Sequence, residues 1–165
     1  MATVWVFDTS SIIEAKSSLP RTDRDRVFAA LTELVRAGRL RFPREVLAEL
    51  KRGADRGVSD RAYLWAQEAE LLACQVTPTF EDVKGVLEVV PDILDSEKES
   101  GVDEADPYVL ALARKLREQG VDARVVTEET KNYARKLSLN TACGIIGIPS
   151  VPLLGLLRAE RIVSA

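Results

Sequence analysis

The apolar run Val4–Phe7 places the strongest constraint on how this chain folds. Its four residues follow one another without a polar position, which is typical of a strand buried on both faces of a parallel sheet. Asp8 ends the run, and Thr9 and Ser10 follow before a new apolar pair that fits the start of a helix. Open α/β sheets bind their ligands at the carboxyl ends of strands. Asp8 is therefore either a helix cap or a functional acid.

Strands and helices are predicted to alternate along the rest of the chain. Short β-branched or alternating runs predict further strands over 39–42, 122–127 and 148–153, with a possible short strand over 74–77. Helical periodicity and capping residues predict helices over 25–36, 43–52, 59–73, 79–90, 106–120, 137–146 and 154–161. The acid-rich segment 91–102 is expected to be a mobile connection or a frayed helical turn. This alternation predicts one domain over residues 1–165, with a parallel sheet covered by helices on both faces.

The composition removes many kinds of catalytic site. The chain has no histidine and two cysteines, which excludes Ser-His-Asp and Cys-His nucleophiles and the usual zinc sites. Neither a GxxxxGK[ST] loop nor a GxGxxG loop is present. Cys74 and Cys143 lie among apolar or small residues and are expected to be buried thiols. Carboxylates, hydroxyls and hard cations remain available for chemistry.

Charge and hydropathy narrow the possible partners and location. The net charge of −3 argues against a sequence-blind nucleic-acid binder, but it permits an enzyme that acts on nucleic acid. No apolar run approaches the roughly 18 residues that span a bilayer. We therefore expect a cytoplasmic protein without a membrane segment.

Several further acids stand where they could reach the same sheet edge as Asp8. Asp106 precedes a proline at the start of a predicted helix, and Glu128 and Glu129 follow the predicted strand that ends at Thr127. Glu49 lies at the margin of the apolar stripe of the helix over 43–52. Each of these acids also has a structural explanation as a cap, a dipole partner or a surface charge.

These acids would indicate a function if their carboxylates lay close together in the folded protein. Two carboxylates about 4 Å apart repel by about 4 kcal/mol at an effective dielectric constant of 20. A cluster would therefore hold protons or bind cations. Ligands that are all oxygen, without histidine, favour Mg²⁺ or Mn²⁺. Protein-bound ions of this kind promote the hydrolysis of phosphodiester bonds. Ser10 and Thr127 would then orient a ligating carboxylate or a metal-bound water.

Four motifs, taken in order, resemble those of a PIN domain: VFDTSSII, PREVLAEL, EADPYVLALA and VVTEE. The later stretch NTACGIIGIPSVPLLGLL is similar to a prokaryotic PIN-like family in which glutamates end the fourth strand. The resemblance implies a three-layer α/β/α sandwich and a ribonuclease that depends on Mg²⁺ or Mn²⁺. It also implies a homodimer and, as in VapC-like toxins, an antitoxin partner.

The resemblance also implies roles for individual residues. Asp8, Glu49 and Asp106 match the first three acids of the pattern, Ser10 matches the hydroxyl beside the first, and Thr127 matches the hydroxyl before the fourth.

The fourth acid departs from the pattern, because many PIN domains have aspartate where this chain has Glu128 and Glu129. The register favours Glu129 as the catalytic acid, and either glutamate could join Asp8 and Asp106 as a metal ligand. Asp103, in the same stretch as Asp106, is an outside candidate.

Two other interpretations remain open. One is a haloacid-dehalogenase-like phosphatase with Asp8 as nucleophile, although Ser10 stands where that family usually has a second aspartate. The other is a PIN-like module that binds RNA or a protein partner without turnover.

Overall fold

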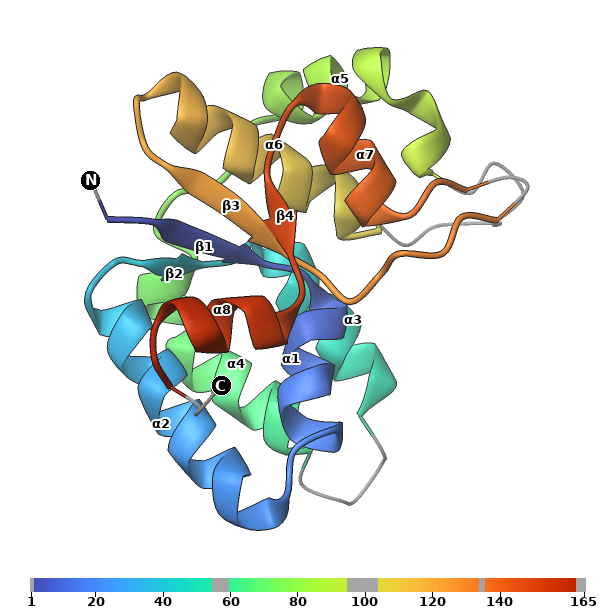
Figure 1. Ribbon diagram of the computed structural model, residues 1–165. Coiled ribbons are helices and arrows are strands. Elements are labelled where there is room, and N and C mark those ends of the chain that lie inside the picture. The colour runs from blue at the N-terminus through green and yellow to red at the C-terminus, as the bar shows by residue number, and fades with distance from the viewer. Residues whose placement is uncertain (1, 55–59, 95–103, 134–135, 163–165) are drawn as a thin grey trace.

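The fold is built on a parallel sheet, which confirms the predicted class. The computed structural model describes residues 2–54, 60–94, 104–133 and 136–162. Within these residues the strands are β1 (Val4–Phe7), β2 (Leu40–Arg41), β3 (Ala123–Val126) and β4 (Ser150–Val151). They lie in the order β2-β1-β3-β4, and all neighbours are parallel (Figure 1). Phe7 pairs with Val126 at the carboxyl ends of the two central strands.

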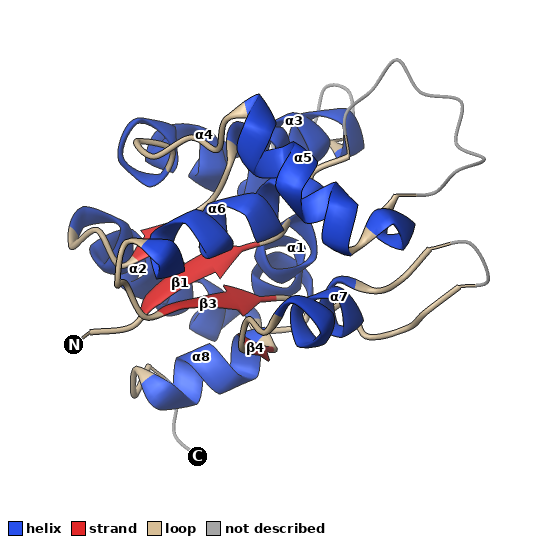
Figure 2. Ribbon diagram, turned by 90° about the horizontal axis from the view of Figure 1, so that it is seen from above, coloured by secondary structure: helices blue, strands red, loops and turns tan. Residues whose placement is uncertain are grey.

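Helices cover both faces of the sheet and complete a three-layer α/β/α arrangement. They are α1 (Thr9–Ser17), α2 (Arg21–Arg36), α3 (Arg44–Gly53), α4 (Arg61–Ala73), α5 (Phe80–Val89), α6 (Asp106–Glu118), α7 (Leu139–Ile146) and α8 (Leu153–Ala159), with a 3-10 turn η1 (Pro91–Ile93). Helix α6 lies over one face with α5 on its outer side, as Figure 2 shows from above. Helices α1, α2 and α8 lie on the opposite face, and α4 packs against α1, α2 and α3.

The central strands are buried on both faces, as the unbroken apolar run of β1 predicts. Val6 and Phe7 have no exposed surface, nor do Val125 and Val126 on β3. Full burial of side chains of this size contributes about 1.5–3 kcal/mol each. The small side chain of Ala113 on α6 is also fully buried, which lets that helix approach the sheet closely.

Several element bounds differ from the prediction. Strand β4 covers only Ser150–Val151 of the expected 148–153, because Pro152 is the cap of α8 and Leu153 is its first residue. Helix α2 begins at Arg21, earlier than expected, because the Pro20 carbonyl already accepts hydrogen bonds from the N–H groups of Asp23 and Arg24. Residues 74–77 form no strand. The backbone N–H of Cys74 instead donates to the Glu70 carbonyl and ends α4.

Both cysteines are buried free thiols, as predicted. Burial raises the pKa of Cys74 to about 12 and, with the charges of Asp8 and Asp106, also that of Cys143 to about 12. These thiols are therefore neutral and unreactive at ordinary pH.

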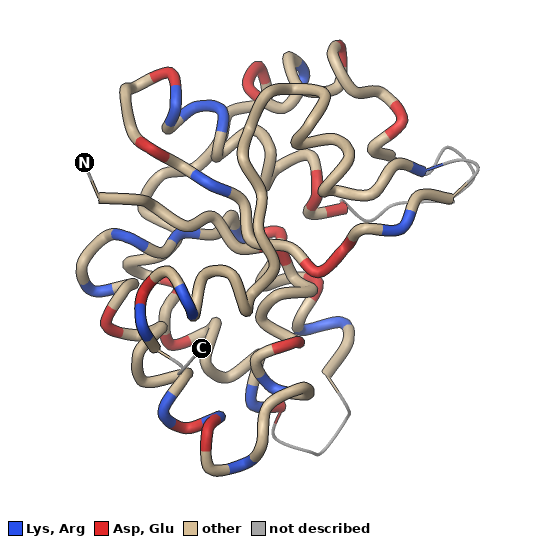
Figure 3. The backbone as a smooth tube through the Cα atoms, viewed as in Figure 1, with Lys and Arg blue, Asp and Glu red and all other residues tan. Residues whose placement is uncertain are grey.

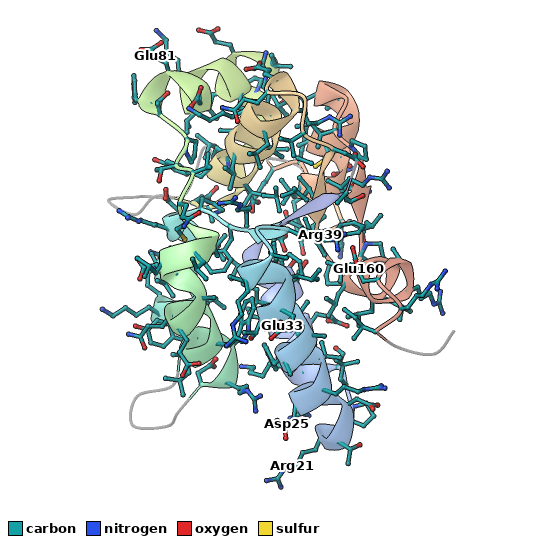
Figure 4. All side chains as sticks on the ribbon, turned by 90° about the vertical axis from the view of Figure 1, so that its left-hand side faces the viewer. Arg21, Asp25, Glu33, Arg39, Glu81 and Glu160 are labelled. Carbon is teal, nitrogen blue, oxygen red and sulfur yellow. The ribbon has the colours of Figure 1, made fainter. Side chains whose placement is uncertain are left out.

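At the amino ends of β1 and β2, one carboxylate joins three segments. Glu160 follows α8 and accepts a hydrogen bond of 2.8 Å from Trp5 Nε1 on β1. The guanidinium of Arg39, just before β2, forms an ion pair with the same carboxylate, and Figure 4 shows these two labelled side chains close together. This contact anchors the closing helix at the end of the sheet away from the residues that follow Phe7 and Val126.

None of the helices in the described ranges combines the length and the apolar character that crossing a bilayer requires.

Candidate functional site

Asp8 is both a helix cap and a member of an acidic cluster. It follows β1 directly, and its Oδ1 accepts a hydrogen bond of 2.9 Å from Ser11 N at the start of α1. The capping explanation considered for the sequence is therefore confirmed. Capping uses one lone pair of a carboxylate that offers about four. The residue is only 1 % exposed, and both of its oxygens accept further hydrogen bonds from side-chain hydroxyls.

Hydroxyl groups surround the Asp8 carboxylate. Thr127 Oγ1 donates to Asp8 Oδ2 over 2.5 Å, and Ser10 Oγ lies 2.8 Å from both Asp8 oxygens. The same two hydroxyl oxygens accept hydrogen bonds of 3.0 Å from Glu129 N and Glu128 N. Thr127 and Ser10 therefore fasten the segment after β3 to the carboxylate that ends β1.

Ser11 also contacts the Asp8 carboxylate, although it was not among the predicted site residues. Its Oγ lies 2.9 Å from Asp8 Oδ1 and 2.7 Å from the Val126 carbonyl oxygen. The available signal was its position three residues after a capping aspartate, where the backbone N–H meets the cap.

Asp106 does not cap α6, and that expectation is wrong. Ala105 is the capping residue, with helical backbone angles and no side-chain cap, so Asp106 is already inside the first turn. Its carboxylate is therefore available for other contacts. Asp106 is 7 % exposed, and its buried Oδ2 lies 3.1 Å from Lys136 Nζ.

Three of the predicted acids converge. One carboxylate oxygen from each of Asp8, Asp106 and Glu129 lies within 4.8 Å of the other two. These acids come from the end of β1, the start of α6 and the segment after β3. Figure 3 shows acidic positions of several segments gathered at the carboxyl ends of the strands. This is the sheet edge at which open α/β folds bind ligands.

Glu49 lies beside the three converging acids and joins the segments that carry two of them. Its Oε1 accepts a hydrogen bond of 2.5 Å from Thr9 Oγ1, and its Oε2 accepts one of 3.3 Å from Ala105 N. Thr9 follows Asp8 and Ala105 precedes Asp106. Glu49 therefore holds the end of β1 and the start of α6 together, outside the group of three converging oxygens.

The two consecutive glutamates point to different parts of the molecule. Glu128 Oε1 accepts a hydrogen bond of 2.6 Å from Leu153 N, at the first residue of α8. Glu129 joins Asp8 and Asp106. Neighbouring side chains in an extended segment point to opposite sides, and no helix begins at this position. Asp103, the outside candidate, lies outside the described residues.

The structure adds a lysine and a further glutamate to the site. Lys136 Nζ lies 3.1 Å from Asp106 Oδ2, 3.9 Å from Glu129 Oε1 and 4.0 Å from Glu104 Oε2. Glu104 belongs to the stretch that suggested Asp106, so its presence has a sequence signal. Lys136 has no such sequence signal, because it lies between Glu129 and α7 and reaches the cluster only through the path that this segment takes in the fold.

The electrostatics of the site follow from burial and from like charges. Burial raises the pKa of Asp8 to about 6, although hydrogen bonds from Thr127, Ser10 and Ser11 oppose the rise. Burial and the charge of Asp106 raise the pKa of Glu129. Burial lowers the pKa of Lys136, but the charges of Asp106 and Glu129 outweigh it and leave that pKa raised.

The donor set fits a hard divalent cation. Asp8, Asp106 and Glu129 offer oxygen ligands only, which is the preference of Mg²⁺ and Mn²⁺. The buried Asp106 Oδ2 contacts the Lys136 ammonium at 3.1 Å, and a carboxylate oxygen has a second lone pair for a further partner. The raised pKa of Asp8 and of Glu129 means that ionising both carboxylates is costly unless positive charge is supplied.

Fold and site together define a three-layer α/β protein with a carboxylate cluster at the carboxyl ends of its parallel strands. The family model described as a domain of unknown function (DUF4411) matches residues 5–164, so the chain belongs to that family. Comparison with curated proteins found no match.

Proposed function

We propose that this protein is a ribonuclease that depends on Mg²⁺ or Mn²⁺ and hydrolyses RNA phosphodiester bonds. The observation that carries the proposal is the convergence of oxygens from Asp8, Asp106 and Glu129 within 4.8 Å. The resemblance of the surrounding motifs to a PIN domain supports the choice of RNA as substrate. The same resemblance makes a homodimer and an antitoxin partner part of the proposal.

The contacts of the site residues suggest which would bind the ion and which would hold its ligands in place. Asp8, Asp106 and Glu129 would hold the ion. When bound, such an ion makes a water more acidic and stabilises negative charge on the leaving oxygen. Thr127 holds Asp8 in place by its hydrogen bond of 2.5 Å. Glu49 holds the segments that carry Asp8 and Asp106 at a constant separation through Thr9 and Ala105.

A phosphatase is the second candidate function, because the structure supplies a lysine that the sequence did not reveal. Lys136 Nζ lies 3.1 Å from Asp106 Oδ2, and phosphatases of the haloacid-dehalogenase kind pair a lysine with an acid. The burial and the hydrogen bonds of Asp8 argue against a phosphatase. A nucleophilic carboxylate must reach the phosphorus atom, whereas Asp8 is 1 % exposed and both of its oxygens accept hydrogen bonds.

The experiment incubates the purified protein with total RNA in Mg²⁺, in Mn²⁺ and in chelator. We expect cleavage with either ion and none with chelator. Asp8→Asn should reduce cleavage by about two orders of magnitude, because a ligand and its charge are lost. Asp25→Asn is the matched control, since the Asp25 side chain is 73 % exposed and pairs with Arg61 at the surface.

Three outcomes would contradict the proposal. Release of phosphate from small esters, without RNA cleavage, would favour the phosphatase. Retention of RNA without cleavage in either ion would favour a binding module. Equal cleavage by the Asp8 and Asp25 variants would place the reaction elsewhere.

A further inference from the structure

The ammonium of Lys136 lies on one side of the carboxylate cluster. It is 3.1 Å from Asp106 Oδ2, 3.9 Å from Glu129 Oε1 and 4.0 Å from Glu104 Oε2. No ion pair within 4.0 Å joins Lys136 to Asp8 in the described part of the chain. The positive charge therefore lies beside Asp106, Glu129 and Glu104, and not beside Asp8.

The side that faces Lys136 has the ligands that a second ion would need. Asp106 Oδ2 is buried and lies 3.1 Å from Lys136 Nζ, and the Glu104 side chain, whose Oε2 lies 4.0 Å from the same ammonium, is only 9 % exposed. Paired ions in hydrolytic sites lie about 3.5–4 Å apart and share a carboxylate between them. An ion shared between Asp106 and Glu104 would meet the Lys136 ammonium at close range, and like charges at this distance repel strongly.

We propose that Lys136 is a resident cation of this site, which supplies positive charge beside Asp106 and Glu104 and limits the site to one divalent ion. The inference rests on the proposed function in one respect, namely that the three converging carboxylates bind such an ion. It adds that the second positive charge comes from the chain itself. Lys136 is thus a positioning residue, and its removal opens a second ion site formed by Asp106 and Glu104.

The test counts bound Mn²⁺ in the full chain without RNA, by calorimetric titration and by electron paramagnetic resonance. The wild-type protein is compared with Lys136→Met and with Lys131→Met. Lys131 is a matched control because it lies in the same segment, is exposed, and sits 5.4 Å from the centre of the Tyr133 ring. Both substitutions remove one lysine charge and keep an unbranched apolar side chain.

We expect one Mn²⁺ in the wild-type protein and in Lys131→Met, and two in Lys136→Met. The two ions of the latter should give the spin-coupled spectrum of a close manganese pair. The double variant Lys136→Met/Glu104→Gln should return to one ion, because it lacks a ligand of the second site. Lys136→Arg, which keeps the charge, should bind one.

The outcomes separate this inference from the proposed function. One Mn²⁺ of unchanged affinity in Lys136→Met would overturn the role of Lys136 and leave the proposed metal site intact. Absence of Mn²⁺ binding from all the proteins would overturn the proposed metal site and the inference with it. Near-ultraviolet circular dichroism checks the fold, and Lys136→Gln replaces Lys136→Met in the same titration if the methionine variant does not fold.

Discussion

Thr127 Oγ1 donates a hydrogen bond of 2.5 Å to Asp8 Oδ2, joining the residues that directly follow the two central strands. Thr127 is 2 % exposed and Asp8 1 %. Water therefore cannot replace this donor easily, and the orientation of the Asp8 carboxylate depends on it. Because the same hydroxyl oxygen accepts from Glu129 N, Thr127 also sets the position of a second acid of the cluster.

Thr127→Val should weaken binding of Mn²⁺ by about 10- to 100-fold, because it leaves the ligating carboxylate without its orienting donor. It should also lower the free energy of unfolding by about 1–3 kcal/mol, since a buried acceptor loses its partner. Thr127→Ser keeps the hydroxyl and should retain most of the affinity. Calorimetric titration with Mn²⁺ measures the first effect and urea unfolding the second. Equal Mn²⁺ affinities for the valine and serine variants would show that the Thr127 hydroxyl does not orient the ligating carboxylate.

The ion-free protein should lose stability as the pH rises from about 4 to above 6. Burial raises the pKa of Asp8 from 3.8 in the unfolded chain to about 6 in the folded protein. The folded state therefore binds more protons in this window. The contribution of Asp8 is fully present below pH 3.8 and is lost as the pH passes 6, by about 3 kcal/mol in total. The raised pKa of Glu129 acts in the same direction.

Asp8→Asn tests this assignment, because the amide has the same shape and does not titrate. In chelator, the fall in stability between pH 4 and 7 should be smaller for Asp8→Asn than for the wild-type protein. Asp25→Asn should follow the wild-type curve. Urea unfolding at a series of pH values provides the measurement, and parallel curves for wild type and Asp8→Asn would contradict the raised pKa.

Alanine substitutions at Glu128 and Glu129 should affect different properties, the stability of the protein and its binding of Mn²⁺ respectively. Glu129→Ala removes a member of the cluster, so it should abolish measurable Mn²⁺ binding while costing little stability in chelator. Glu128→Ala removes the acceptor of Leu153 N at the start of α8. It should cost about 1–2 kcal/mol of stability and leave Mn²⁺ affinity unchanged. Calorimetry and thermal unfolding on both variants distinguish the roles, and an exchange of the two phenotypes would assign Glu128 to the cluster.

Glu160→Ala should destabilise the protein by about 1–3 kcal/mol without changing Mn²⁺ affinity. The substitution leaves Trp5 Nε1 without its acceptor and Arg39 without its ion-pair partner. Both partners lie at the amino ends of the strands, away from the cluster. Thermal unfolding measures the loss of stability, and calorimetric titration measures the affinity for Mn²⁺. Weaker Mn²⁺ binding by Glu160→Ala would indicate coupling between the two ends of the sheet.

The sequence by itself determined the sheet and the edge at which acids would gather. The run Val4–Phe7 predicts a buried parallel strand, and the similar run that ends at Val126 predicts another strand of the same sheet. Parallel strands bring their carboxyl ends to one edge, so Asp8 and the acids after Val126 are expected at that edge. These inferences depend on local periodicity and on topology, which the order of residues carries directly. The pairing of β1 with β3, which brings them side by side, comes from the structure.

The tertiary structure decided what the sequence left open at the site. Local pattern favoured Asp106 as a helix cap, but the helical backbone of Ala105 moves the start of the helix and releases the carboxylate. The glutamate that joins the cluster was decided by the contact of Glu128 with Leu153 N, a residue distant in sequence. Lys136 arrives through the path of the segment after Glu129. Such contacts between distant segments depend on how the whole chain packs, which no window of neighbouring residues encodes.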